Sequence, residues 1–120
     1  MGNTFAFSAG QLQSLGALVG QTAVKTAKEM QTRLRLLDVL DFTEEEQGQI
    51  SWREMPDGRV TFAPDVMMSR AVPPHQRAQL IDLVKANIAT FPPQTFRLFV
   101  LPALLTLGYD FMAAGENGEL

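Results

Sequence analysis

The chain has 120 residues, of which 46% are hydrophobic and 19% are charged, enough for one domain with a buried core and too few for two. The absence of cysteine and the single histidine exclude disulfides, a thiolate nucleophile, and metal sites built from cysteines or two imidazoles. The net charge of −3 argues against a general nucleic-acid-binding protein, because such domains usually present a strongly basic surface.

The N-terminal third is predicted to form one long helix. Ser8 is a suitable N-cap, and apolar or small residues recur at steps of three and four from Leu12 to Leu37, which places them on one stripe of a helix. Gly16 and Gly20 each cost about 1 kcal/mol relative to alanine inside a helix. A break near residue 20 is therefore an alternative to a continuous helix.

An acidic segment marks the start of a further helix. Thr43 is followed three residues later by Glu46, the spacing of a capping box in which each side chain accepts a hydrogen bond from the other residue's backbone amide. Glu44 and Glu45 fall in the first turn, where the helix dipole favours negative charge. Because adjacent helical side chains point in different directions, the three carboxylates indicate a helix start rather than a metal site.

From Ile50 the hydrophobic period changes to two, which predicts a β-hairpin over residues 50–62. Apolar and polar residues alternate on both sides of residues 56–58, Pro-Asp-Gly. In such a turn the proline fits the first corner and the glycine supplies a positive φ. Residues 66–72 are a candidate third strand, which Pro64 would confine to a sheet edge or a bend.

Two helices are predicted after residue 72. Pro73 and Pro74 suit a first helical turn, and a stripe of leucine, isoleucine and valine follows until residues 92–93, two prolines, stop the helix. The last helix is predicted over residues 95–107, with Gly108 just beyond its end and a kink at Pro102.

These elements predict a single α+β domain over residues 1–108 and a mobile C-terminal tail over residues 109–120. The domain would combine a long N-terminal helix, a small antiparallel hairpin or sheet, and two C-terminal helices.

The sequence carries no recognisable targeting signal. Residues 1–10 lack the basic and apolar regions of a secretory signal, and Ala6 stands where an N-myristoylation motif needs serine or threonine. The longest apolar run, residues 98–105, would span roughly 12 Å as a helix, whereas a bilayer core measures about 30 Å. A cytoplasmic protein without membrane association is expected.

The order of these motifs resembles a known group of proteins. An amphipathic helix precedes Phe42-Thr43-Glu44-Glu45-Glu46, and Ile50, Trp52, a hairpin centred on Asp57-Gly58-Arg59-Val60 and a helix rich in leucine and isoleucine follow. Over residues 34–88 the chain resembles small proteins of bacteriophages and prophages that have no assigned activity. It departs from them at Phe62, where tryptophan is frequent, and in the more hydrophobic segment 96–107. The resemblance implies phage origin, a compact α+β fold and the cytoplasm of the host cell.

Catalytic constellations are scarce. His75 lies in a predicted first helical turn, where the dipole disfavours its protonated form, and no serine–histidine–aspartate spacing or phosphate-binding loop is present. A carboxylate pair among Asp38, Asp41 and Glu45 stays open, because sequence does not reveal geometry. We therefore expect no enzyme, no cofactor and no metal.

Charge is segregated along the chain. Residues 25–35 are rich in lysine and arginine, whereas residues 38–57 contain seven acidic residues and one basic residue. This segregation suits either steering of a charged partner or head-to-tail pairing of two copies, and a solvated helix face is the alternative interpretation. The candidate partner-binding or ligand-binding residues are Lys25, Lys28, Arg33, Arg35 and Arg59.

The last predicted helix is apolar on nearly all sides, with Arg97 as its only charged residue. Small domains have little surface with which to cover such a helix, so we expect homo-oligomerisation through it, with burial at the centre of the monomer as the alternative. The candidate interface residues are Phe96, Phe99, Leu101 and Leu105.

Three functional hypotheses follow. The first is a non-enzymatic accessory protein of phage type that binds a host or phage protein on an oligomeric scaffold. The second is a protein that sequesters a nucleotide-like anion through Arg33, Arg35 or Arg59, because arginine donates two parallel hydrogen bonds to phosphate. The third is a weak nucleic-acid binder that uses Lys25, Lys28 and Arg35.

Overall fold

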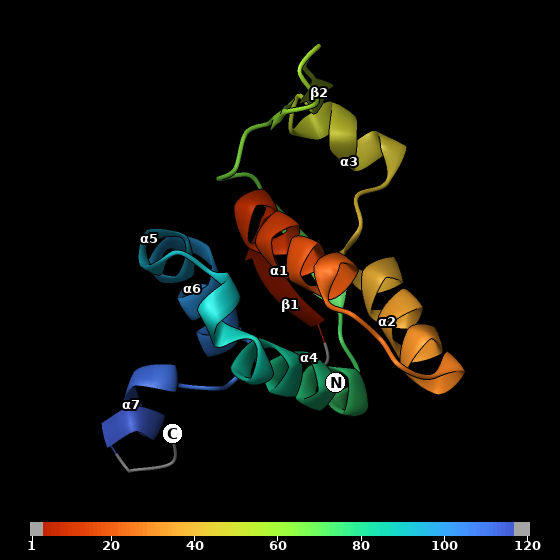
Figure 1. The fold of residues 1–120 in the computed structure, drawn as a ribbon. Coiled ribbons are helices and arrows are strands. Elements are labelled where there is room, and N and C mark those ends of the chain that lie inside the picture. Colours follow the sequence, from red (N-terminus) through yellow and green to blue (C-terminus); the bar gives the residue numbers. More distant parts are fainter. Residues whose placement is uncertain (1–3, 117–120) are drawn as a thin grey trace.

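The computed structural model describes residues 4–116, which adopt the α+β fold that the sequence predicts. In chain order, the elements are β1 Thr4–Ser8, α1 Ala9–Gln21, α2 Ala27–Leu40, α3 Glu44–Gln49, β2 Arg53–Glu54, β3 Val60–Thr61, β4 Met67–Ala71, α4 Pro74–Ala86, η1 Ile88–Thr90, α5 Pro93–Thr95, η2 Phe96–Val100, α6 Leu101–Thr106 and α7 Phe111–Glu116. Helix α1 occupies the centre, with α2 on one side and α5 and α6 on the other (Figure 1).

The predicted long helix is divided into α1 and α2 by residues 22–26. Ser8 caps α1 as expected, because its hydroxyl accepts from the Gln11 amide at 3.2 Å while the Gln11 side chain accepts from the Ser8 amide at 3.0 Å. The break follows Gly20, and Thr26 then caps α2 by accepting from the Glu29 amide at 3.1 Å. Helix α2 folds back on α1, so that Leu40 lies 3.9 Å from the position of a Cβ built on Gly16.

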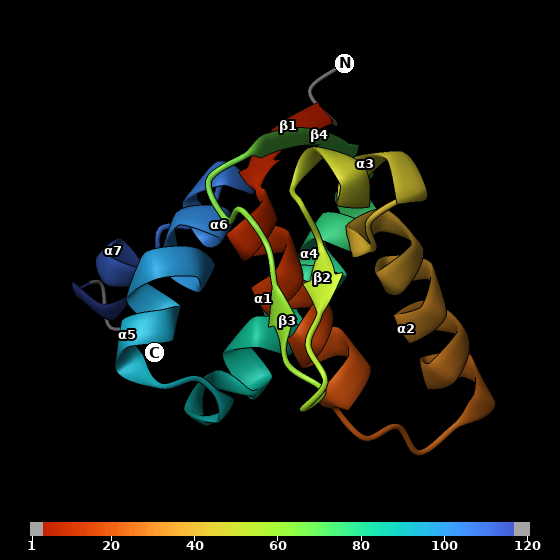
Figure 2. The same cartoon turned by 90° about the horizontal axis from the view of Figure 1, so that it is seen from above.

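The first element of the chain, strand β1, was not predicted from the sequence. β1 pairs antiparallel with β4, with Phe7 opposite Met68, and both side chains are buried. The candidate third strand at residues 66–72 is thus present as β4, but it pairs with the N-terminus rather than with the hairpin. Figure 2 shows this two-stranded sheet at one end of α1.

Helix α3 and the hairpin form a unit that we call the arm, residues 42–63 (Figure 2). The predicted capping box is present, with the Glu46 amide donating to the Thr43 hydroxyl at 3.1 Å and the Thr43 amide donating to Glu46 Oε1 at 3.0 Å. The predicted hairpin is confirmed by the pairing of β2 with β3 and by the positive φ of Gly58.

Ser51, two residues beyond the end of α3, has a φ of 57°, the only positive value among the described residues other than glycine. L-residues pay about 1–2 kcal/mol for this conformation and glycine does not. Glycine also adds entropy to the unfolded chain, which offsets part of this gain. We therefore expect Ser51→Gly to raise the free energy of unfolding by about 0.5 kcal/mol net. Thermal unfolding measures the change, and Ser51→Ala is the control. An equal gain from alanine would contradict this explanation, since alanine retains the Cβ.

The two predicted C-terminal helices are also present. Helix α4 begins at Pro74, and the second helical segment runs through α5, η2 and α6 to Thr106, followed by Gly108 with a φ of 93°. The irregularity expected at Pro102 takes the form of a π-turn in η2, where the Leu101 amide donates to the Phe96 carbonyl five residues earlier. Proline has no amide hydrogen to continue the helical ladder, so a widened turn just before it relieves the geometry.

Part of the segment predicted as a tail is helical. The Tyr109 amide donates to the Leu104 carbonyl at 2.8 Å, the Lys85 ammonium lies 5.2 Å from the centre of the Tyr109 ring, and α7 follows with Ala114 buried. Phe111 packs edge-on against Phe96 with ring centres 5.1 Å apart. Residues 1–3 and 117–120 lie outside the described part of the chain. Within residues 4–116, no helix combines the length and the apolar character that a membrane span requires.

Candidate functional site

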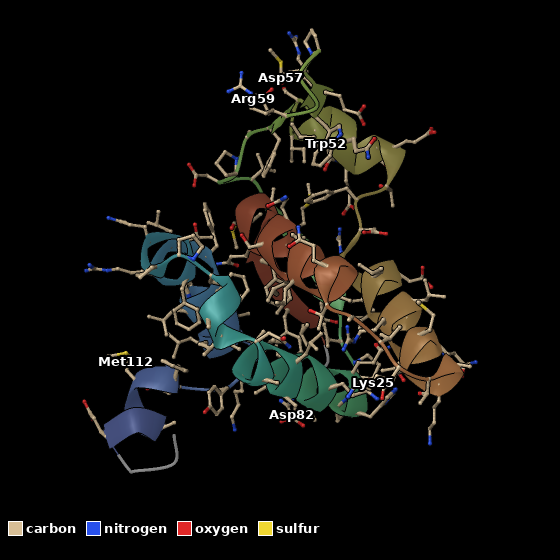
Figure 3. All side chains as sticks on the ribbon, in the orientation of Figure 1. Lys25, Trp52, Asp57, Arg59, Asp82 and Met112 are labelled. Atoms are coloured by element: carbon tan, nitrogen blue, oxygen red, sulfur yellow. The ribbon has the colours of Figure 1, made fainter. Side chains whose placement is uncertain are left out.

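The structure separates the five predicted basic residues. Lys28 and Arg33 line one hollow of about 310 Å³ beside the start of α2, whereas Arg59 lies at the hairpin tip, far from Lys25 (Figure 3). Arg59 pairs there with Asp57 at 2.6 Å, and both side chains are exposed. Arg35 is exposed on α2 and does not line that hollow. The sequence-predicted set therefore does not form one site.

Carboxylates accompany the cations in that hollow. Glu29 lines it and accepts a hydrogen bond from the Lys25 amide at 2.9 Å, while Arg33 donates to the Thr22 carbonyl at 2.9 Å. A second hollow of about 330 Å³, between α2 and α4, contains Arg33 together with Asp82. One hydrogen-bond donor of Arg33 is thus used to hold the loop between α1 and α2. An anion bound in either hollow would also lie near a carboxylate.

The predicted oligomer residues divide into two groups. Phe96 packs between Phe91 and Phe111, with ring centres 6.1 and 5.1 Å away, and the Phe99 ring lies directly over Gly10. These two side chains contact the monomer itself. In contrast, Leu105 is 51% exposed and Leu101 is half-buried.

Leu98, which is not among the predicted interface residues, is 61% exposed. It lies three residues before Leu101 and seven before Leu105, in the helical segment formed by η2 and α6. We call Leu98, Leu101 and Leu105 the C-terminal stripe. The recurrence of leucine at these positions was the available signal for Leu98.

A second surface feature lies between α1, the end of α2 and the arm. It is a groove of about 180 Å³ whose lining includes Gly16, Ala17, Leu40, Asp41, Phe42 and Trp52, and we call it the aromatic groove. The ring centres of Phe42 and Phe62 lie 5.6 and 5.6 Å from that of Trp52. Figure 3 places Trp52 where α3 meets the hairpin. The sequence placed Trp52 and Phe62 on the predicted hairpin and Phe42 in the acidic segment before it, and it did not bring them beside α1, because that wall comes from a distant part of the chain.

Arg70 on β4 fastens the arm to the body of the protein. Its guanidinium makes two charge-assisted hydrogen bonds to the Glu46 carboxylate, at 2.6 and 2.7 Å, and donates to the Asp41 carbonyl at 3.3 Å. The hydrogen bond from Arg70 lowers the pKa of Glu46, and the Thr43 amide adds to this lowering against the opposing effect of burial. The ion pair is structural, and no spacing or motif in the sequence pointed to Arg70 as the partner of Glu46.

The candidate catalytic residues are exposed. His75 lies in the first turn of α4, and Asp38, Asp41 and Glu45 lie at the end of α2 and the start of α3. No three histidine, cysteine, aspartate or glutamate residues within residues 4–116 form a group suited to holding a metal ion.

Comparison with known proteins adds no relative: no family model, curated protein or solved structure matches the chain. The resemblance to phage proteins therefore stays a prediction from the sequence.

Proposed function

We propose that this chain is a non-enzymatic accessory protein that acts by binding other proteins, and that it does so as a homo-oligomer assembled through the C-terminal stripe. The observation that carries the proposal is the exposure of two leucines, Leu98 and Leu105, in the C-terminal helical segment. Apolar surface exposed to water costs about 25 cal/mol per Å² relative to burial, so covering this stripe favours association. Phage origin belongs to the proposal through the sequence resemblance alone.

A second copy of the chain is the occupant that this stripe fits best. Residues 86–109 contain a single charged residue, Arg97, so the surface offers few charges with which to select an unlike partner. A two-fold axis lets one apolar patch cover the same patch on the second copy. The nearly uncharged stripe avoids the repulsion between like charges that a charged patch would meet in such an arrangement.

Leu105→Glu tests the assembly. Each two-fold contact would bring two carboxylates into apolar surroundings, where unpaired charge is strongly disfavoured, and we expect the dissociation constant of the oligomer to rise at least ~10-fold. Light scattering coupled to size-exclusion chromatography measures the effect, and circular dichroism should show unchanged folding because Leu105 is half-exposed in the monomer.

Leu34→Glu is the matched control, because Leu34 is 54% exposed on α2, outside the C-terminal stripe. It should leave the oligomer intact. A monomer of 13.2 kDa for the unmodified chain at high micromolar concentration would contradict the proposal, as would equal dissociation of the two variants.

The anion-sequestering and nucleic-acid hypotheses have weaker support. Glu29 and Asp82 line the hollows that hold Lys28 and Arg33, and carboxylates repel phosphate. Thermal stabilisation by nucleotides would favour sequestration. DNA binding that falls steeply with salt would favour the nucleic-acid hypothesis.

A further inference from the structure

The aromatic groove is open because its floor lacks a side chain. A Cβ placed on Gly16 would contact only the Leu40 Cβ, at 3.9 Å, so the hollow above α1 is filled neither by this residue nor by a close neighbour. Its volume of about 180 Å³ exceeds the roughly 150 Å³ of a protein cavity that accommodates benzene. The groove therefore has room for one large side chain.

The aromatic wall is held in place from within the arm. Trp52 stacks on Phe62 with an interplanar angle of 25°, and Phe42 packs against both rings, tilted by 53° to Trp52 and with its ring centre 6.4 Å from that of Phe62. The Trp52 amide also donates to the Gln47 carbonyl at 2.9 Å. A fixed aromatic face offers a binding surface that loses little side-chain entropy when a ligand arrives.

The surroundings of this wall are negatively charged. Asp41 lines the groove, and within residues 4–116 the only ion pairs are Arg70–Glu46 and Arg59–Asp57. Among residues 38–57, the other acidic side chains are all exposed: Asp38, Glu44, Glu45 and Glu54. Arg53 is the only basic residue among residues 38–57. The charge of Arg70, whose side chain reaches the Asp41 carbonyl, is balanced by Glu46.

We propose that the aromatic groove receives an arginine side chain from a basic segment of a partner protein. The guanidinium would stack on the Trp52 ring and pair with the Asp41 carboxylate. Arginine fits this combination better than lysine, because its planar group both stacks on aromatic faces and donates two parallel hydrogen bonds to a carboxylate. The proposal rests on the proposed protein-binding function, and it gives that function a second surface and a partner of defined charge.

Trp52 is the only tryptophan of the chain, so its fluorescence reports on the groove directly. The probe is the peptide acetyl-Ala-Arg-Ala-Arg-Ala-amide, titrated into the full chain, with peptides that carry glutamine or glutamate instead of arginine as comparisons. We expect a saturable change in Trp52 emission with the arginine peptide, weakened by salt, and none with the glutamate peptide. No change up to about 1 mM, or an equal response to the glutamine peptide, would overturn the proposal.

Gly16→Leu fills the groove without altering Trp52. We expect it to weaken arginine-peptide binding at least ~10-fold, which corresponds to the loss of one desolvated cation–π contact. Gly20→Leu is the matched control, because a Cβ at Gly20 meets no atom within 4 Å and this residue does not line the groove. Asp41→Asn should weaken binding ~5-fold and reduce its salt dependence. Normal affinity in Gly16→Leu would overturn the proposal.

Separate variants test the C-terminal stripe and the aromatic groove. Gly16→Leu should keep the oligomeric state of the unmodified chain, and Leu105→Glu should keep its affinity for the arginine peptide. If Trp52 emission changes with protein concentration alone, and the change is lost in Gly16→Leu, the groove accepts a second copy of the chain and the inference of a separate basic partner is wrong.

Discussion

Replacing Arg70 with methionine is expected to lower the free energy of unfolding by about 3 kcal/mol, because it strands a partly buried carboxylate. The side chains of Arg70 and Glu46 are only 11% and 19% exposed, so water replaces the lost partner incompletely. The Asp41 carbonyl also loses a donor. Urea unfolding at neutral pH, followed by Trp52 fluorescence and circular dichroism, measures the change.

Arg53→Met is the matched control, because Arg53 is exposed on the hairpin and surface charges of this kind contribute within about 0.5 kcal/mol. Glu46→Gln adds a double-mutant cycle: removal of both charges should cost less than the sum of the single changes. A loss in Arg70→Met no larger than in Arg53→Met would show that the ion pair does not fasten the arm.

The same ion pair predicts a dependence of stability on pH. Arg70 lowers the pKa of Glu46 in the folded protein, so the folded state holds this proton less tightly than the unfolded chain does. The stabilising contribution is present above the unfolded-state pKa of about 4.3 and is lost as the pH falls through the folded-state value. Arg70→Met should remove this part of the acid sensitivity, and an unchanged profile below that pH would contradict its assignment to Glu46.

Gly10→Ala is expected to lower the free energy of unfolding by about 1 kcal/mol net, because an overfilled core costs about 2 kcal/mol. A Cβ on Gly10 would lie 2.8 Å from Phe99 Cδ1, and closer still to Cε1, so the aromatic ring must move. This cost outweighs the gain of about 1 kcal/mol that alanine brings to a helix. Thermal and urea unfolding provide the measurement.

Two further variants isolate the cause. Gly20→Ala, on the same helix, meets no atom within 4 Å and should be neutral or stabilising. Phe99→Leu should recover part of the loss when combined with Gly10→Ala, because the smaller side chain leaves room for the new methyl group. Equal losses in Gly10→Ala and Gly20→Ala would exclude the contact with Phe99 as the reason.

The sequence by itself determined the local features of the fold. Ser8 and Thr43 cap helices through hydrogen bonds that span three residues, and Gly58 and Gly108 adopt the positive φ values that their turns require. These features depend on residues close together in the chain, so spacing and residue type are sufficient to predict them. The alternation of apolar and polar residues that predicts the hairpin is likewise a local feature.

Tertiary structure decided the contacts between distant segments. The pairing of β1 with β4 joins residues 59 to 67 positions apart, and Arg70 pairs with Glu46 across 24 positions. The break near residue 20, which Gly16 and Gly20 allowed as an alternative, is present. The packing of α2 back against α1 that follows it was not revealed by the continuous apolar periodicity. Propensity and periodicity describe one segment at a time, whereas these arrangements depend on which surfaces bury one another.

The candidate binding surfaces also depend partly on the local sequence and partly on tertiary packing. The sequence correctly marked the segment 96–107 as unusually apolar, but only packing determined that Phe96 and Phe99 contact the monomer while Leu98 and Leu105 reach the solvent. The aromatic groove needs walls from α1, α2 and the arm, and no single segment contains it. A residue type states what a side chain is able to bind, and the neighbours that the fold supplies determine whether it is accessible to do so.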